Sequence, residues 1–115
     1  MSKLHVNGID LHYEKIGEGQ PILFIHGLGS SAQDWERQIP SFSGQYQTIT
    51  FDLRGHGQSQ KPHGPYSMLL FANDTAELIK ALEVAPVYIV GISLGGMIAF
   101  QLAVDNPGLV KSMVI

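Results

Sequence analysis

The sequence predicts an α/β fold, in which a mainly parallel sheet has helices on both faces and an N-terminal β-hairpin. Continuous apolar runs at residues 21–25 and 87–90 are typical of strands that are buried on both faces. Segments with helical periodicity separate such runs, and this alternation implies a parallel sheet covered by helices. The 115 residues contain no linker or repeat, so we expect residues 1–115 to form a single domain.

The first half of the chain is predicted to begin with a hairpin over residues 3–15. An Asn7-Gly8 turn lies between two alternating segments there, which is a strong hairpin signal. Residues 21–25 form the first buried strand. Residues 30–39 are then predicted as a short helix, with a serine as its cap and Pro40 as its end. Residues 46–53 return to a strand.

The second half is predicted as helix, strand, helix and strand. Residues 67–83 have an amphipathic pattern, and residues 87–90 form a buried strand. Residues 94–104 are apolar almost all round, so we expect this helix to be covered on all sides. Residues 110–115 begin an apolar strand at an uncovered edge. Because such edges pair readily with another chain, we expect self-association through this strand and its neighbouring faces.

Composition narrows the classes of partner and cofactor. The net charge is −3 with no run of Lys or Arg, which argues against nucleic acid or an anionic membrane as a partner. There is no cysteine, so disulfides and thiolate zinc sites are excluded, and the histidines do not share a helix face. The opening residues resemble no signal peptide, and no apolar run is as long as a membrane span. We therefore expect a cytoplasmic protein.

The segment Gly91-Ile92-Ser93-Leu94-Gly95 matches the G-x-S-x-G pattern of a nucleophile elbow. A nucleophilic serine must project from a sharp strand-to-helix turn, and small flanking residues give the room for that turn. The N-terminus of the following helix favours negative charge, and the N–H of Leu94 becomes an oxyanion donor. We therefore predict Ser93 as the nucleophile. The alternative is a glycine-rich turn with an idle serine.

Three segments appear in a characteristic order: HGLGS at residues 26–30, DLRGHGQS at residues 52–59, and GISLG at residues 91–95. Together they resemble the N-terminal part of the α/β-hydrolase superfamily, most closely its small esterase, enol-lactonase and cofactor-free haloperoxidase-like members. The opening hairpin and Trp35 agree with this resemblance.

The resemblance implies a serine hydrolase that transfers an acyl group from a carboxylic ester or lactone to water, without a metal or an organic cofactor. The N–H of Leu28 would be the second oxyanion donor, and His26 and Gly27 would support its loop. Branches such as epoxide hydrolases use Asp where this chain has Ser93. Loop hydrogen bonding is expected for Asp52, Arg54 and His56, and a surface position for His5, His12 and His63.

The general base and acid are missing after the nucleophile. A serine nucleophile needs a histidine oriented by a carboxylate, and in this fold both follow the serine. Only Asp105 and no histidine follow Ser93. Three explanations stay open: a fragment of a longer enzyme, a truncated non-catalytic module that dimerises, or recruitment of His26 or His56 as the base.

A second interpretation is a dinucleotide-binding domain. Residues 27–32 match G-x-G-x-x-A after a strand, and Asp52 ends the next strand at about the expected spacing. The early Pro40 and the preceding hairpin argue against it, and it does not explain the elbow.

Overall fold

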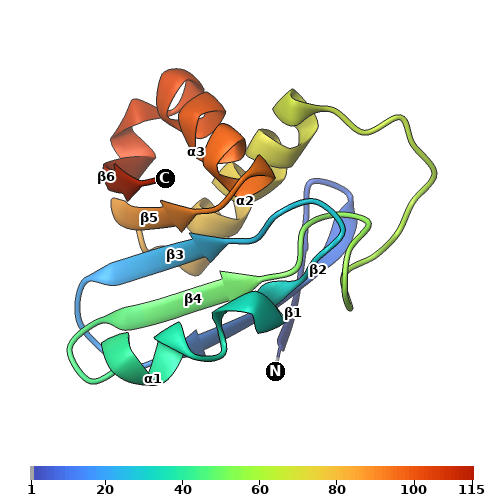
Figure 1. Ribbon diagram of the computed structural model, residues 1–115. Helices are drawn as coiled ribbons and strands as arrows, with labels where there is room; N and C mark the ends of the chain where they lie inside the picture. Colours follow the sequence, from blue (N-terminus) through green and yellow to red (C-terminus); the bar gives the residue numbers. More distant parts are fainter. Residues whose placement is uncertain (1) are drawn as a thin grey trace.

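A computed structural model describes residues 2–115. A six-stranded sheet has the order β1-β2-β4-β3-β5-β6 and forms the centre of the molecule (Figure 1). The strands are β1 (Ser2–Val6), β2 (Ile9–Ile16), β3 (Pro21–Ile25), β4 (Gln47–Phe51), β5 (Val87–Gly91) and β6 (Val110–Val114). The α-helices are α1 (Gln38–Phe42), α2 (Met68–Leu82) and α3 (Leu94–Asp105), and the 3₁₀ helices are η1 (Ala32–Trp35) and η2 (Pro107–Leu109).

The strand directions confirm a mainly parallel sheet with an opening hairpin. Asn7 and Gly8 have φ angles of 49° and 81°, as the two central residues of a type I′ turn require. This turn joins β1 to β2, and β2 runs antiparallel to β4. The pairs β4–β3, β3–β5 and β5–β6 are all parallel.

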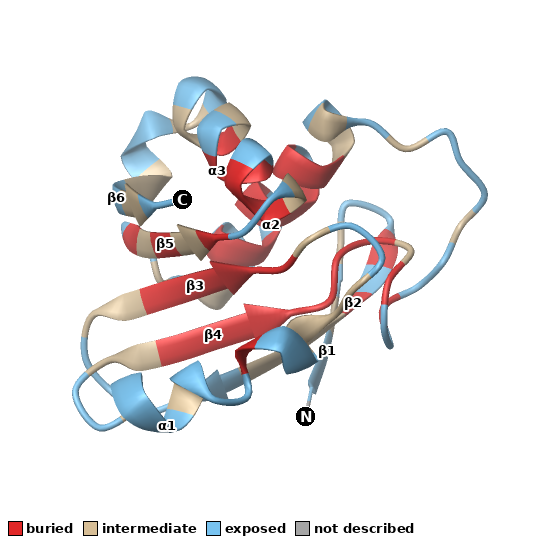
Figure 2. Cartoon of the chain, viewed as in Figure 1, coloured by how far each residue is buried: buried red, intermediate tan, exposed pale blue. Residues whose placement is uncertain are grey.

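Both faces of β3 and β4 are covered, as the apolar run at residues 21–25 predicts. The prediction that residues 87–90 are buried on both faces is wrong for one face, because Tyr88 and Val90 of β5 are only half-buried. Successive residues of β3 point to opposite faces: Leu23 and Ile25 join a core cluster with α2 and α3, whereas Phe24 packs with Trp35 of η1. These strand residues are at most 1% exposed. The buried centres of β3 and β4 are visible in Figure 2, and helices therefore lie on both faces.

The predicted helix over residues 30–39 is wrong in its extent. A 3₁₀ turn, Ala32–Trp35, is capped by Ser31, whose Oγ accepts a hydrogen bond from the N–H of Gln33 (3.3 Å). A separate helix, α1, begins at Gln38 and contains Pro40 in its first turn. Proline is tolerated there because the first N–H groups of a helix have no intrahelical acceptor, so Pro40 does not end the helix.

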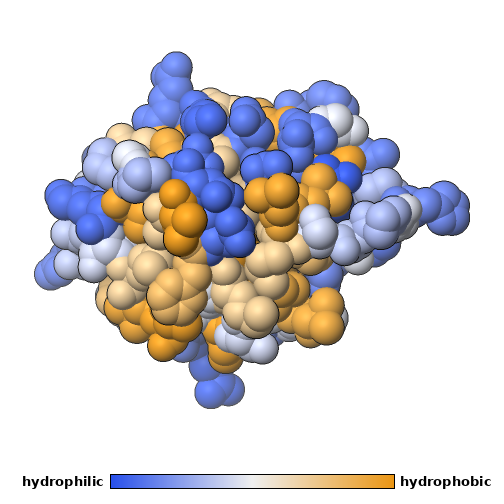
Figure 3. Space-filling view, turned by 90° about the horizontal axis from the view of Figure 1, so that it is seen from above, coloured by the Kyte–Doolittle hydropathy of each residue, from blue (hydrophilic) through white to orange (hydrophobic). Residues whose placement is uncertain are grey.

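The expectation that α3 is covered on all sides is also wrong. Its inner face is buried against the sheet and α2. Its outer face is apolar yet exposed: Met97, Phe100 and Val104 are 58%, 56% and 76% exposed. Hydrophobic atoms gather on part of the surface seen from above in Figure 3. The apolar pattern of this helix therefore predicts burial correctly only for the face that a neighbouring element covers.

Candidate active site at the β5–α3 turn

The turns after β3 and β5 meet at one edge of the sheet. These strands are parallel neighbours, so their carboxyl ends lie together. The chain continues from β3 to β4 on one side and from β5 to β6 on the other, so the strand order reverses between β3 and β5. Open α/β sheets bind ligands at such a reversal of strand order. The N–H of Ile92 donates to the carbonyl of Ile25 (3.2 Å). A Cβ atom built on Gly27 would lie 3.6 Å from the Cβ of Ser93, so the two turns are in contact.

Ser93 has a strained backbone. Its φ and ψ angles are 55° and −118°, which residues other than glycine rarely adopt. Such a conformation costs on the order of 1–3 kcal/mol and is typical of functional sites. The residue is exposed, and its carbonyl accepts hydrogen bonds from the N–H groups of Gly96 (2.9 Å) and Met97 (3.1 Å) in α3. The sharp turn leaves the serine at the surface of the sheet edge.

Gly91 and Gly95 allow α3 to approach the sheet closely. A Cβ atom on Gly95 would lie 2.1 Å from the carbonyl oxygen of Ile25 in β3. A Cβ atom on Gly91 would lie 2.6 Å from the carbonyl oxygen of Gly95. Both obstacles are backbone atoms, which cannot rotate away. Only glycine therefore fits at these two positions without moving the helix.

Leu28 and Leu94 lie in the two turns that meet beside Ser93. Leu94 is the first residue of α3, where backbone N–H groups have no intrahelical acceptor. Leu28 is 76% exposed, in a loop where the N–H of Ser30 donates to the carbonyl of Gly27 (3.2 Å). The positive end of the α3 dipole also faces this edge. This arrangement suits a negatively charged group next to Ser93.

His26 is completely buried and uses both ring nitrogens within the protein. Nε2 accepts a hydrogen bond from the N–H of Leu53 (3.0 Å), and Nδ1 donates to the carbonyl of Gly27 (2.7 Å). Burial lowers the pKa of His26 and keeps the ring neutral. The ring thus joins the loop after β3 to the end of β4, and neither nitrogen is free to accept a proton from Ser93.

Asp52 connects two loops through its carboxylate. The oxygens accept hydrogen bonds from the N–H groups of Ala32 (2.8 Å) and Gln58 (2.9 Å). The Nδ1 atom of His12 lies 3.3 Å from Asp52 Oδ2, and the His12 side chain is only 11% exposed. The predicted surface position of His12 is therefore wrong, because the loop after β4 covers it; His5 and His63 are exposed as predicted.

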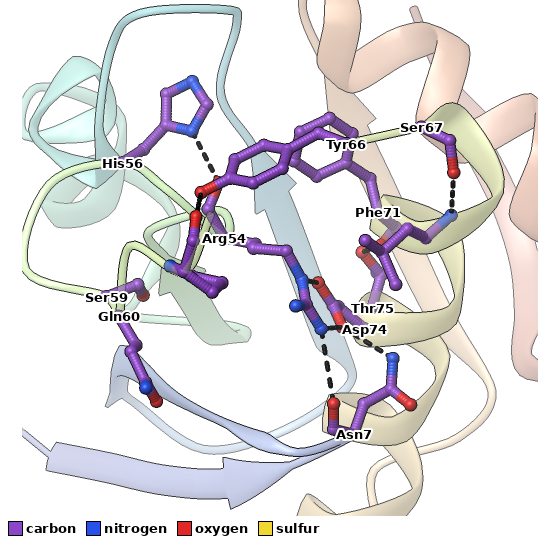
Figure 4. A network of polar contacts seen from close by, with 12 residues as sticks. Asn7, Arg54, His56, Ser59, Gln60, Tyr66, Ser67, Phe71, Asp74 and Thr75 are labelled. Carbon is purple, nitrogen blue, oxygen red and sulfur yellow. Dashed lines mark hydrogen bonds and ion pairs between the residues drawn. The ribbon is translucent and has the colours of Figure 1, made fainter. Parts of the chain in front are cut away.

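Arg54 forms a buried ion pair with Asp74 of α2 (Figure 4). Its Nε and Nη2 atoms donate to the two carboxylate oxygens, each at 2.8 Å. Asn7 of the hairpin turn donates to the same carboxylate (2.7 Å). Hydrogen bonding to Asp74 raises the pKa of Arg54.

Sequence reasoning missed Asp74. The available signal was a carboxylate between Phe71 and Leu78 on the buried face of an amphipathic helix, where a charge requires a partner.

His56 also has a role in the loop. Its Nδ1 donates to the carbonyl of Arg54 (2.9 Å), and its ring lies 5.1 Å from the ring of His26, measured between centroids. The loop hydrogen bonding expected for Asp52, Arg54 and His56 is present in these contacts.

The dinucleotide interpretation is wrong. Residues 27–32 lead into a single 3₁₀ turn rather than a long helix. Asp52 is 4% exposed, and its carboxylate accepts hydrogen bonds from two loop N–H groups. Within residues 2–115, no group of three or more His, Asp or Glu side chains could hold a metal ion. None of the helices in this part of the chain has the length and apolarity to cross a membrane.

Two hollows on the described surface lie away from Ser93. One, of about 520 Å³, lies between η1 and the strands β2 and β4, and the other, of about 560 Å³, lies over β3, β5 and β6. Ser93 lines neither of them. Ser93 itself is exposed at the carboxyl edge of the sheet.

Comparison with known proteins agrees with this geometry. Residues 20–115 match the family described as the alpha/beta hydrolase fold. The chain is 38% identical over 109 residues to (E)-2-((N-methylformamido)methylene)succinate hydrolase of Acinetobacter baylyi, and 36% identical over 110 residues to a soluble epoxide hydrolase of Corynebacterium. The matches cover 95% and 96% of this chain but only 41% and 38% of those relatives.

Two solved structures are similarly close. An N-acyl homoserine lactone degrading enzyme is 37% identical with a TM-score of 0.93, covering 97% of this chain and 43% of that one. The enol-lactonase of Burkholderia xenovorans is 29% identical with a TM-score of 0.94, covering 97% of this chain and 45% of that one. The protein therefore belongs to the α/β-hydrolase fold family, whose members it matches over about two fifths of their length.

Proposed function

We propose that Ser93 is the nucleophile of a hydrolase that transfers an acyl group from a carboxylic ester or a lactone to water. The observation that carries this proposal is the exposed serine in a strained conformation between Gly91 and Gly95, at the carboxyl edge of the sheet. Strain of this kind persists only where the surrounding structure enforces it, and it is common at active sites.

In the proposed reaction, the Oγ of Ser93 attacks the substrate carbonyl carbon and the alcohol or enolate leaves. The backbone N–H groups of Leu28 and Leu94 would hold the oxyanion, each contributing about 3 kcal/mol to transition-state stabilisation. Water would then release the acyl group from the serine. No step in this scheme requires a metal or an organic cofactor.

The substrate class rests on the nucleophile and on the relatives together. An N-acyl homoserine lactone degrading enzyme and an enol-lactonase are among the similar structures, and both names refer to lactones. An epoxide hydrolase is also among the relatives. A serine at this position favours acyl transfer over epoxide opening, because the epoxide-hydrolysing branches use a carboxylate nucleophile there.

The general base and its carboxylate are proposed to come from outside these 115 residues. Both nitrogens of His26 are hydrogen-bonded within the fold. His56 is buried and its Nδ1 donates to a backbone carbonyl, so its Nε2 is the one ring nitrogen of these two histidines with a lone pair to accept a proton. A serine without a base is a poor nucleophile. The isolated chain should therefore hydrolyse esters slowly unless a base is supplied.

The test supplies that base as free imidazole. The chain and its Ser93→Ala variant are compared for hydrolysis of p-nitrophenyl butyrate over a range of imidazole concentrations. Intact-mass spectrometry follows the butyryl group on the protein. We expect a Ser93-dependent rate that rises with imidazole, and acylation that is lost in Ser93→Ala. The variant also measures the hydrolysis that imidazole causes by itself.

Two results would contradict the proposal in different ways. Equal rates and no acylation at every imidazole concentration would mean that Ser93 is not a nucleophile, as expected for a non-catalytic module. A Ser93-dependent rate that is already present without imidazole would contradict the proposal that the base comes from outside these residues, and would make Nε2 of His56 the first candidate.

A further inference from the structure

The hollow between η1 and the strands β2 and β4, which we call the β2–η1 hollow, has the size of a small-molecule site. Its volume is about 520 Å³, and hollows of about 300–1,000 Å³ hold small organic ligands. All of its lining residues lie between positions 12 and 58. In the sheet order, β3 and β5 separate its strands from β6. The hollow is therefore built entirely by the first half of the chain.

Three carboxylates from three segments line this hollow. Glu14 lies two residues after His12 on β2, so strand alternation puts both side chains on the face that forms the hollow. Glu36 directly follows η1, and Asp52 directly follows β4. Within residues 2–115, no Lys or Arg lines the hollow or forms an ion pair with these three groups; Lys3 stands across from His12 on β1. The lining is therefore negatively charged and favours a cation.

The imidazole of His12 lacks hydrogen-bond partners in the wall of the hollow. Its side chain is only 11% exposed, and both ring nitrogens are buried without a partner among the described residues. Nδ1 lies 3.3 Å from Oδ2 of Asp52, which accepts one hydrogen bond from Gln58 and has a lone pair for another. Buried polar atoms are nearly always satisfied in native proteins, and a bound ligand is one way to satisfy them. This corner of the hollow therefore has unused hydrogen-bonding capacity.

The rest of the lining is mostly apolar. Ile16 of β2 and Ala32 of η1 contribute to it, together with Ile39 and Pro40 of α1. A metal ion does not fit this lining, because no group of three or more His, Asp or Glu side chains within residues 2–115 could hold one. An apolar group of a ligand would gain free energy by covering these side chains. The hollow therefore suits a cation that has an apolar body.

We propose that the β2–η1 hollow binds a small organic ammonium ion with an apolar body. The ammonium group would lie among the carboxylates of Glu14, Glu36 and Asp52, and the apolar body would cover Ile16 and Ile39. Charge complementarity supplies the selectivity, and apolar contact adds affinity. Ser93 does not line the hollow, so this inference does not depend on the proposed hydrolase function.

Three probes of nearly equal size test the role of charge. Phenethylamine carries an ammonium group, phenethyl alcohol is neutral, and phenylacetate carries a carboxylate. Binding is followed through the backbone amide NMR signals of the isotope-labelled chain. We expect phenethylamine to bind with a millimolar Kd that rises with ionic strength, and to shift the signals of His12, Ala32 and Gln58. The other two probes should bind about tenfold more weakly.

A pair of charge-removing variants locates the site. Glu36→Gln removes one carboxylate from the hollow and nearly keeps the shape of the side chain, so the Kd for phenethylamine should rise about threefold. Glu77→Gln is the matched control, because it removes the same charge from the exposed side of α2, on the other face of the sheet. Its Kd should equal that of the parent. Circular dichroism verifies that both variants fold.

Three results would overturn the proposal. Equal binding of the three probes, or no binding of phenethylamine, would mean that the hollow does not select a cation. Signal shifts that gather at residues 91–95 would place the amine at the Ser93 turn instead. An equal rise of Kd in Glu36→Gln and Glu77→Gln would mean that the amine responds only to the net charge of −3.

Discussion

Gly95 of α3 lies directly against the backbone at the end of β3. In Gly95→Ala, the new Cβ atom would lie 2.1 Å from the carbonyl oxygen of Ile25 and 2.8 Å from that of His26. Alanine gains at most about 1 kcal/mol over glycine here, because Gly95 is the second residue of α3 and not an interior one. Overpacking against backbone that cannot rotate away costs up to about 3 kcal/mol. The variant should therefore lose about 2 kcal/mol of unfolding free energy, or roughly 8 °C in Tm.

The measurement is urea unfolding at one fixed protein concentration, so that association affects all variants equally. Gly44→Ala is the control, because no heavy atom lies within 4 Å of its Cβ position and its φ is not positive. Its stability should stay within about 0.5 kcal/mol of the parent. Gly96→Ala should fall between the two, because its one close obstacle is the flexible side chain of Ile115 (2.5 Å), whereas the carbonyl oxygen of Gly91 lies at an ordinary contact distance of 3.6 Å. If Gly95→Ala equals or exceeds the parent in stability, α3 is free to move away from β3 and the argument for a required glycine fails.

Three further changes test the site's other features. Asp74→Ala would leave the buried Arg54 charge unpaired and should cost about 3–5 kcal/mol of unfolding free energy in urea; a loss below about 1 kcal/mol would show that the pair is dispensable. Ser93→Gly relieves a strained φ and should raise unfolding free energy by about 1 kcal/mol, so a loss of stability would argue against strain. Burial lowers the pKa of His26. As the pH falls below about 6.5, the unfolded chain therefore binds a proton at His26 that the folded protein does not bind. The unfolding free energy of the parent, relative to that of His26→Gln, should therefore decrease as the pH falls from about 7.5 to about 5. A difference between the two that does not change with pH would contradict this.

Local patterns predicted most of the elements correctly. The Asn7-Gly8 turn, the apolar run of β3 and the start of a helix near residue 67 each depend on a few neighbouring residues. Ser67 accepts a hydrogen bond from the N–H of Leu70 (3.0 Å), as a cap should. Pro40 shows the limit of this reasoning: the residue is compatible with either the end or the first turn of a helix, and packing decides between them.

Features that depend on distant segments were not predictable from the residues alone. The position of β4 between β2 and β3 is determined by pairing between segments that are distant in the sequence. His12 follows the buried Leu11 in an alternating strand, and this pattern predicts a surface position for His12. A loop more than forty residues later nevertheless covers the residue, and the Oγ of Ser59 accepts a hydrogen bond from the backbone N–H of His12 (2.9 Å). The elbow at Ser93 was predictable because its geometry comes from five consecutive residues, whereas a general base would have to come from elsewhere.

The Arg54–Asp74–Asn7 network has a consequence for how the molecule unfolds. It joins the hairpin turn, the loop after β4 and helix α2, which are separated by up to 67 residues. The hairpin pairs with the rest of the sheet through β2–β4 alone and would otherwise be the first part to fray. Opening it would remove a partner from a buried carboxylate, so local opening is penalised. The network thus merges the hairpin, the loop and α2 into one cooperative unit, whose amides should be protected from hydrogen exchange to a similar degree.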